Sequence, residues 1–167
     1  MIMSRSVNIL SNLVDEIYYR LTNTWQQTTK SLAVYNNENQ IIGMSITSEN
    51  DEQQLWKIKQ LNDNNNFTLS TKLNKANQVL TLISEFPYKL KLAPLEEQSP
   101  YQQWIFVLTN YPHEQQSAYR IKSRYLETID KQFHLDLLND STAENSYRVA
   151  MRQQRHYSGQ YWKLTNR

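Results

Sequence analysis

The chain has 167 residues and a mass of 19.9 kDa, a length that suits a single domain. Its 18 Lys and Arg residues are nearly balanced by 16 Asp and Glu residues, which disfavours a protein that binds nucleic acid through its phosphates. Because the chain has no Cys and only two Gly residues, we exclude disulfides, thiolate metal sites and glycine-rich phosphate loops.

Residues 1–17 form an N-terminal extension that lies outside the repeated part of the sequence. Its apolar residues fall on one face of a helix, and Ser6 is in position to cap the first turn. We predict a short helix packed on the domain, with a frayed tail as the alternative. The apolar residues of this face are Ile9, Leu10, Leu13, Val14 and Ile17.

The sequence shows neither a clear signal peptide nor a membrane span. Polar residues such as Asn8, Asn12 and Asp15 interrupt any apolar core near the N-terminus. The longest apolar run, Trp104–Leu108, is far shorter than the roughly 20 residues of a transmembrane helix. We therefore expect no transmembrane segment, and either a cytoplasmic location or export by a non-classical route.

Three of the four tryptophans follow a glutamine by two positions, at Gln54-Leu55-Trp56, Gln102-Gln103-Trp104 and Gln160-Tyr161-Trp162. Gln makes up only 16 of the 167 residues, so three such matches indicate an internal repeat. Each repeat opens on an aromatic residue that precedes its Trp by 37, 37 or 43 positions. These aromatic residues are Tyr19, Phe67 and Tyr119.

Each repeat contains four short apolar-x-apolar segments, and this period-two alternation predicts half-buried β-strands. The segments are 19–21, 32–34, 42–44 and 56–58 in the first unit (18–60), 67–69, 80–82, 90–92 and 104–106 in the second (66–108), and 119–121, 135–137, 149–151 and 162–164 in the third (118–165). Polar stretches rich in Asn, Ser, Thr and Gln separate the segments and predict turns. The sequence therefore predicts an all-β domain of twelve strands over residues 18–167.

A single four-stranded unit of this size cannot bury its own apolar face, whereas three units around a pseudo-threefold axis share one core and close a barrel. We predict that Trp56, Trp104 and Trp162 lie in this core and that Trp25, outside the repeat, is more exposed. The repeated glutamines, Gln54 and Gln102 among them, are predicted to satisfy buried backbone groups near each Trp.

The threefold Gln-x-Trp, the Leu-x-apolar element before it and the spacing between them resemble the ricin-B-like, or R-type, β-trefoil lectin family. The segments Tyr18–Asn23 and Ser158–Leu164 are especially similar to bacterial members, and the resemblance extends over residues 18–167. It implies a β-trefoil with pseudo-threefold symmetry that binds a glycan or glycoconjugate, without a cofactor and without catalysis.

The resemblance also implies which unit binds sugar. The family's key acid follows the Leu of the Leu-x-apolar element, and this position holds Ala33, Thr81 and Asp136, so only the third unit keeps the acid. The alternative is that Asp136 caps a turn within 139–145. The third unit departs from the family at Gly159, where a polar residue usually precedes the Gln. The predicted carbohydrate-binding residues are Asp136 as anchor, Asn139 and Asp140 at the rim, Tyr147 or Tyr157 as the stacking ring, and Gln160.

No catalytic constellation is visible in the sequence, which lacks a nucleophile elbow, a metal-ligating pair of His and a phosphate loop. The three histidines, His113, His134 and His156, show no ligand spacing, and we expect them at the surface, with His134 pointing out of its strand. We therefore expect no metal site, no cofactor and no enzymatic activity.

Two functions remain open. The retained Asp136 favours a carbohydrate-binding module or lectin with at most one intact site, in the third unit. The missing acids of the other units favour a protein-binding β-trefoil, such as a protease inhibitor or the targeting module of a toxin or effector. Arg148, Arg152 and Arg155 form a modest basic cluster with Tyr157, but we do not expect a nucleic-acid partner.

Overall fold

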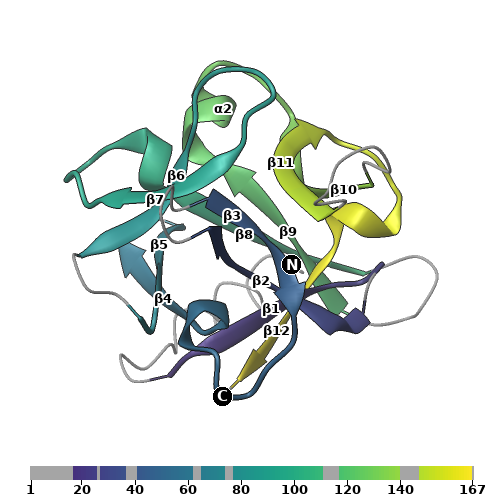
Figure 1. The fold of residues 1–167 in the computed structure, drawn as a ribbon. Helices are drawn as coiled ribbons and strands as arrows, with labels where there is room; N and C mark the ends of the chain where they lie inside the picture. Colours follow the sequence, from purple (N-terminus) through teal and green to yellow (C-terminus); the bar gives the residue numbers. More distant parts are fainter. Residues whose placement is uncertain are drawn as a thin grey trace.

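The structure is a computed structural model, and it describes residues 17–25, 27–36, 41–61, 65–73, 77–110, 117–139 and 147–166. The predicted N-terminal helix, His113 and Asp140 lie outside these residues. The regular structure of the described chain is almost entirely β-strand (Figure 1). Its strands are β1 (Tyr19–Asn23), β2 (Gln27–Asn36), β3 (Ile41–Ile46), β4 (Trp56–Leu61), β5 (Asn66–Thr71), β6 (Gln78–Leu82), β7 (Leu90–Pro94), β8 (Trp104–Asn110), β9 (Ser117–Ser123), β10 (Phe133–Asn139), β11 (Tyr147–Gln153) and β12 (Trp162–Asn166).

Every predicted apolar-x-apolar segment lies within one of these strands, so the all-β prediction is confirmed. The described helical structure is short and falls in connections between strands. It consists of one α-helical turn, α2 (Arg124–Thr128), and three 3₁₀ turns, η1 (Glu52–Gln54), η2 (Pro100–Gln102) and η3 (Ser158–Gln160).

The first and last strands of the three units form a closed antiparallel ring in the order β1–β4–β5–β8–β9–β12, with β12 pairing back to β1. Within each unit the opening aromatic residue pairs with the Trp of the last strand. These register pairs are Tyr19 with Trp56, Phe67 with Trp104 and Tyr119 with Trp162. Closure of the ring leaves no exposed sheet edge in the barrel.

The two middle strands of each unit form a hairpin, and the three hairpins are joined to one another. Ile41 of β3 pairs with Lys91 of β7, Gly43 of β3 pairs with Arg148 of β11, and an isolated bridge links Lys89 to Ala150. A six-stranded barrel with three joined hairpins is the β-trefoil architecture, and its three equivalent units are visible in Figure 1.

The three repeated tryptophans are fully buried, as predicted. Each indole Nε1 donates a hydrogen bond to the carbonyl of the Leu that begins the second apolar-x-apolar segment of the same unit. The bonds run from Trp56 to Leu32 (2.8 Å), from Trp104 to Leu80 (3.0 Å) and from Trp162 to Leu135 (3.0 Å). Trp25 is 42% exposed, which confirms that it lies outside the core.

The three repeated glutamines fix the segment that links the third strand of each unit to its 3₁₀ turn. Each amide donates to one backbone carbonyl and accepts from the backbone N–H two residues later, as predicted for Gln54 and Gln102. The carbonyls are Ile46 (2.6 Å), Pro94 (2.8 Å) and Gln153 (2.8 Å), and the N–H groups are those of Ser48 (2.9 Å), Glu96 (2.8 Å) and Arg155 (2.8 Å).

In the described residues we find no helix that has both the length and the apolar character to span a membrane.

We predict that Trp104→Ala lowers the free energy of unfolding by about 3–5 kcal/mol, because it removes a packed aromatic ring and leaves the carbonyl of Leu80 without its donor. The matched variant Trp25→Ala should change it by less than about 0.5 kcal/mol, since that ring is largely in solvent. Chemical denaturation of the two variants measures the difference. Equal midpoints would contradict a core role for the repeated Trp.

Candidate functional site

Asp136 lies on β10 and is completely buried, with an exposed fraction of 0%. The repeated Gln reaches this position in two units, because Gln160 Nε2 lies 3.2 Å from Asp136 Oδ2 and Gln102 Nε2 lies 3.2 Å from Thr81 Oγ1. The third equivalent, Ala33, has no polar side-chain atom to offer. The three units therefore share the same backbone arrangement and differ in the side chain at the position of Asp136, which is Ala33 in the first unit and Thr81 in the second.

Tyr157 covers the buried carboxylate. Its hydroxyl donates a hydrogen bond to Asp136 Oδ2, while 47% of its surface remains exposed. In the acid predicted to anchor a sugar, Asp136, the Oδ2 atom thus already accepts hydrogen bonds from Tyr157 and Gln160. The Tyr157 ring is partly exposed to solvent. Among the described residues, the side chains that donate to Asp136 are these two; residues 140–145 of the turn that it was alternatively predicted to cap lie outside the described residues.

Gly159 makes this close packing possible. A Cβ atom at this position would lie 2.7 Å from Asp136 Oδ1 and 3.0 Å from the carbonyl of Leu137. The carbonyl of Gly159 also accepts a buried hydrogen bond from Asn23 Nδ2 (2.8 Å), which links η3 to the end of β1. The glycine at position 159 therefore has a steric reason, since a Cβ atom there would collide with the carboxylate.

Burial raises the pKa of Asp136 above its ordinary value, and this effect exceeds the opposing effects of the bonds from Tyr157 and Gln160 and of the positive charge of Arg152. Burial and the neighbouring Asp136 raise the pKa of Tyr157 to about 12. The Tyr157 hydroxyl therefore stays protonated at physiological pH and acts as a donor to Asp136. Asp136 Oδ1 is buried and has no hydrogen-bond partner among the described residues.

The prediction that His134 points out of its strand was wrong, because only 2% of His134 is exposed. It belongs to a polar cluster around the buried Arg120. This guanidinium donates to His134 Nδ1 (2.7 Å), Gln160 Oε1 (3.2 Å), Tyr161 Oη (2.6 Å) and the carbonyl of Arg155 (2.8 Å). His156 is exposed, as predicted.

A guanidinium only donates hydrogen bonds, so His134 Nδ1 is the acceptor and the neutral ring carries its proton on Nε2. Burial lowers the pKa of His134 to about 4, and the positive charges of Arg120 and Lys122 add to the effect. His134 is therefore neutral in the folded protein at physiological pH.

A sequence signal for this cluster exists in the opening Tyr-Arg-apolar triplet, which occurs in units one and three. Arg20 is equivalent to Arg120, and its Nη2 donates to the carbonyl of Ser48 (3.0 Å), as Arg120 does to the carbonyl of Arg155. In both units, the residue whose carbonyl accepts from the Arg also donates its N–H to the repeated Gln. From the sequence we recognised the aromatic residue that opens this triplet as part of the repeat, but not the Arg as a buried group.

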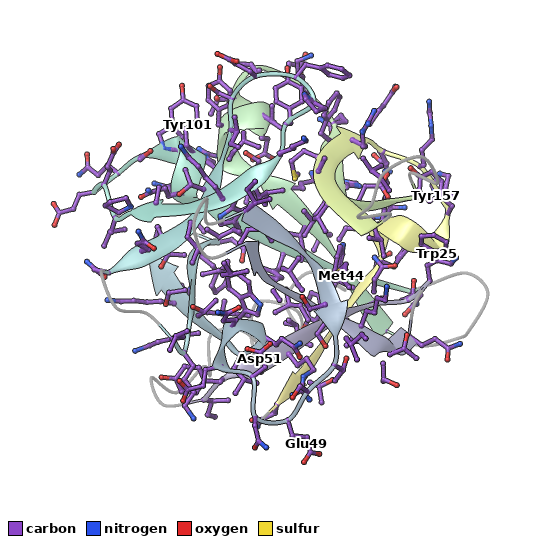
Figure 2. The ribbon with its side chains drawn as sticks, in the orientation of Figure 1. Trp25, Met44, Glu49, Asp51, Tyr101 and Tyr157 are labelled. Atoms are coloured by element: carbon purple, nitrogen blue, oxygen red, sulfur yellow. The ribbon has the colours of Figure 1, made fainter. Side chains whose placement is uncertain are left out.

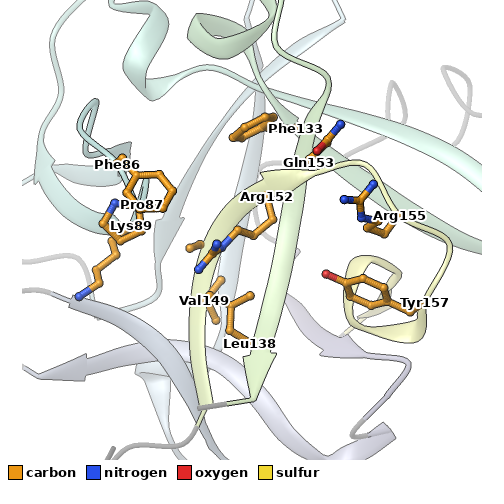
Figure 3. A pocket seen from close by; sticks show the side chains of 11 residues that line it. Phe86, Pro87, Lys89, Phe133, Leu138, Val149, Arg152, Gln153, Arg155 and Tyr157 are labelled. Carbon is orange, nitrogen blue, oxygen red and sulfur yellow. The ribbon is translucent and has the colours of Figure 1, made fainter.

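A pocket of about 640 Å³ opens between the second and third units. One wall is the loop before β7 and the other is the β10–β11 hairpin together with the segment that leads to η3. Figure 3 shows Phe86 and Lys89 on one side, Arg155 and Tyr157 on the other, and Arg152 between them. The lining residues are Phe86, Pro87, Lys89, Phe133, Leu138, Val149, Ala150, Arg152, Gln153, Arg155 and Tyr157.

Backbone hydrogen bonds hold the two walls together. The N–H of Met151 donates to the carbonyl of Tyr88 (3.0 Å), beside the bridge between Lys89 and Ala150. Within the loop, the N–H of Tyr88 donates to the carbonyl of Glu85 (2.8 Å). The pocket is thus part of the junction between two hairpins, and sequence reasoning within one unit missed its far wall.

Of the other predicted site residues, Asn139 and Tyr147 are register partners at the end of the β10–β11 hairpin where the chain passes from one strand to the next. Gln160 is buried and is engaged with Gln153, Arg155, Asp136 and Arg120. The structure therefore brings together Asp136, Tyr157 and Gln160. Over the described ranges no group of three or more His, Asp or Glu residues is arranged to hold a metal ion.

The sequence matches no protein-family model and no curated protein sequence. The structure matches solved β-trefoils at low sequence identity. The designed threefold-symmetric protein ThreeFoil has a TM-score of 0.64 at 18% identity, with 88% of this chain and 96% of that chain covered. A Polyporus squamosus lectin bound to the epitope Neu5Acα2-6Galβ1-4GlcNAc has a TM-score of 0.65 at 18% identity, with 89% and 48% covered.

A mosquitocidal holotoxin has a TM-score of 0.68 at 15% identity, with 88% of this chain covered. This chain spans only 17% of the holotoxin chain and about half of the Polyporus lectin. The fold is a β-trefoil. At these identities the comparison extends to the fold alone.

We predict that acid destabilises the protein partly through His134. Because folding lowers its pKa from 6.5 to about 4, its contribution to the free energy of unfolding is complete above about pH 6.5 and is lost as the pH falls towards 4. The free energy of unfolding lost through His134 over this range amounts to roughly 3 kcal/mol. His134→Gln keeps an acceptor for Arg120 without titrating. The difference in unfolding free energy between wild type and this variant should change between pH 7 and pH 4, and a constant difference would contradict the assignment.

We predict that Gly159→Ala lowers the free energy of unfolding by about 1–3 kcal/mol, because the added Cβ overlaps Asp136 Oδ1. The double variant Asp136→Ala/Gly159→Ala should recover part of this loss, since the first unit has Ala33 at the position of Asp136. A double-mutant cycle by denaturant unfolding measures the coupling. Strict additivity would show that the carboxylate does not require the glycine.

Proposed function

We propose that this chain is a glycan-binding β-trefoil of the R-type family, with its one sugar site in the third unit. The observation that carries the proposal is the Tyr157 ring, which is half-exposed at the edge of the pocket while its hydroxyl is fixed to a buried carboxylate. An aromatic ring held in one orientation offers a flat face to the C–H surface of a sugar. Its fixation reduces the entropy that binding would otherwise cost.

The rest of the pocket supports the same ligand class. Its volume of about 640 Å³ lies within the range of small-ligand sites. Gln153 and the cationic side chains provide hydrogen-bond groups for sugar hydroxyls, and Leu138 and Val149 provide apolar surface. The Polyporus lectin, which has the same fold, was crystallised with a sialylated epitope.

In this proposal Asp136 is a positioning residue. Its Oδ2 atom accepts from Tyr157 and Gln160, so it orients the ring instead of contacting the sugar. The equivalent positions Ala33 and Thr81 have no such ring above them, because Asp51 and Ser99 stand where the third unit has Tyr157. This difference explains why we place the site in one unit only. We also propose that the chain binds its ligand without catalysing a reaction.

The burial of Asp136 favours a second candidate, a protein-binding or targeting role. The exposed aromatic residues Trp25 and Phe86 suit a protein contact, and a mosquitocidal holotoxin contains a domain of the same fold. Under this alternative the chain recognises a protein surface through its loops and binds no glycan.

We predict that the wild-type chain binds a subset of spots on a glycan array and that Tyr157→Ala weakens this binding at least about tenfold, because the stacking face is lost. Tyr157→Phe keeps the ring but loses the bond to Asp136, so it should give an intermediate loss.

The matched control is Tyr101→Ala, which removes an aromatic residue from the corresponding turn of the second unit and should leave binding unchanged. Tyr101 and Tyr157 lie on different sides of the molecule in the view of Figure 2. Thermal melts confirm that each variant is folded. An array on which folded wild-type protein binds nothing would contradict the proposal and favour the protein-binding alternative.

A further inference from the structure

We propose that the pocket between the loop before β7 and the β10–β11 hairpin takes a sugar that carries an anionic group, either a carboxylate or a sulfate. This inference rests on the proposed function and names the class of glycan that the site recognises.

The lining of the pocket is positively charged. Lys89, Arg152 and Arg155 all line the pocket, and no Asp or Glu is among the lining residues. Within the described part of the chain, none of these three cations forms a salt bridge. Asp136, the carboxyl on which the charge of Arg152 acts, is buried beneath Tyr157 and does not line the pocket. A concave surface with unpaired charges of one sign attracts a ligand of the opposite sign.

Arg152 lies between the two walls of the pocket and has an unsatisfied donor (Figure 3). Its guanidinium lies over the ring of Phe86, with Cζ 5.7 Å from the ring centroid. Its Nε is buried and has no hydrogen-bond partner among the described residues. A planar guanidinium held on an aromatic ring with an unsatisfied donor is suited to bidentate bonding of a carboxylate or sulfate.

The pseudo-threefold symmetry provides two internal comparisons for the cations of the third unit. The repeated Gln binds the carbonyls of Ile46, Pro94 and Gln153, so these positions are equivalent. Arg152 then corresponds to Ser45 and Ala93, and Arg155 corresponds to Ser48 and Glu96. The other two units fold in the same way without a cation at either position. The fold itself therefore does not require the two arginines, which are specific to the third unit.

The sequence around the third site shows the same bias. From Asn145 to Arg167 there are five Lys and Arg residues and no Asp or Glu, although the whole chain has 18 against 16. An even distribution would place acids among these residues. Two of these five cations, Arg152 and Arg155, line the pocket.

The shape of the site favours a sugar over a nucleic acid. Proteins that bind single strands use a charged groove with several stacking rings in series. Here the cations converge on one pocket of about 640 Å³, beside Phe86, which is 75% exposed, and the ring of Tyr157. A pocket of this size suits one or two sugar residues with a charged substituent.

The test compares pairs of glycans that share a core and differ in one anionic group. Three pairs, sialylated, uronate-bearing and sulfated, are measured against their neutral counterparts by titration at low and at physiological salt. We expect at least tenfold tighter binding of one acidic member, weakening with salt. Comparison of the sulfated pair with the sialylated and uronate-bearing pairs shows whether the pocket recognises a sulfate or a carboxylate.

Two charge-reversal variants complete the design. Arg155→Glu introduces the residue of the second unit and should weaken binding of the acidic glycan about tenfold to a hundredfold, far more than it weakens binding of the neutral counterpart, which carries no anionic group for Glu to repel. Lys59→Glu makes the same change of charge at an exposed position of β4 and should have no effect. Arg152→Gln removes the guanidinium without reversing its charge, and thermal melts show that each variant is folded.

Each outcome has a distinct meaning. Equal binding of acidic and neutral glycans, with no effect of Arg155→Glu, overturns this inference and leaves the proposed function intact. Binding of no glycan overturns both. Tight binding of a fluorescent oligonucleotide that is lost in Arg155→Glu, without glycan binding, overturns both and assigns the pocket to nucleic acid.

Discussion

The architecture depends on satisfying six buried polar side chains, three indole N–H groups and three glutamine amides. A buried donor without an acceptor costs about 1–3 kcal/mol, so each must find a partner. Each indole donates to a carbonyl of the same unit's second strand, and each amide binds the segment after its third strand. These bonds fix each hairpin against the barrel, and the joined hairpins then place the loop before β7 against β11.

The third unit shows how one frame accommodates different chemistry. Gln160 makes the two backbone bonds of its equivalents and also contacts Asp136 and Arg120. The amide of Gln160 thus links the buried carboxyl of Asp136 to the buried guanidinium of Arg120, so these two groups are connected through an amide and not by a direct ion pair. His134 and Tyr157 complete the network as a neutral acceptor and a protonated donor. Such a network is stable only when most of its members are satisfied, and this requirement gives the Tyr157 ring a defined position.

The pocket belongs to the junction of two units and to neither unit alone. Phe86 and Lys89 come from the second unit, whereas Arg152, Arg155 and Tyr157 come from the third. The repeat creates three such junctions in principle, but side chains decide what each can bind. Here three cations and the exposed rings of Phe86 and Tyr157 line one of them, so a symmetric fold presents an asymmetric surface.

The sequence by itself determined the twelve strands, the burial of the three tryptophans and the structural role of the glutamines, because period-two alternation and a repeated motif are local patterns. It also singled out Asp136. Only the tertiary structure decided that β10 is covered on both faces, by the core on one and by the segment before Trp162 on the other. A polar side chain in a strand is expected to face water, so His134 was placed wrongly. Its partner Arg120 and the cover Tyr157 lie on other elements, and no local pattern identifies contacts between residues that only folding brings together.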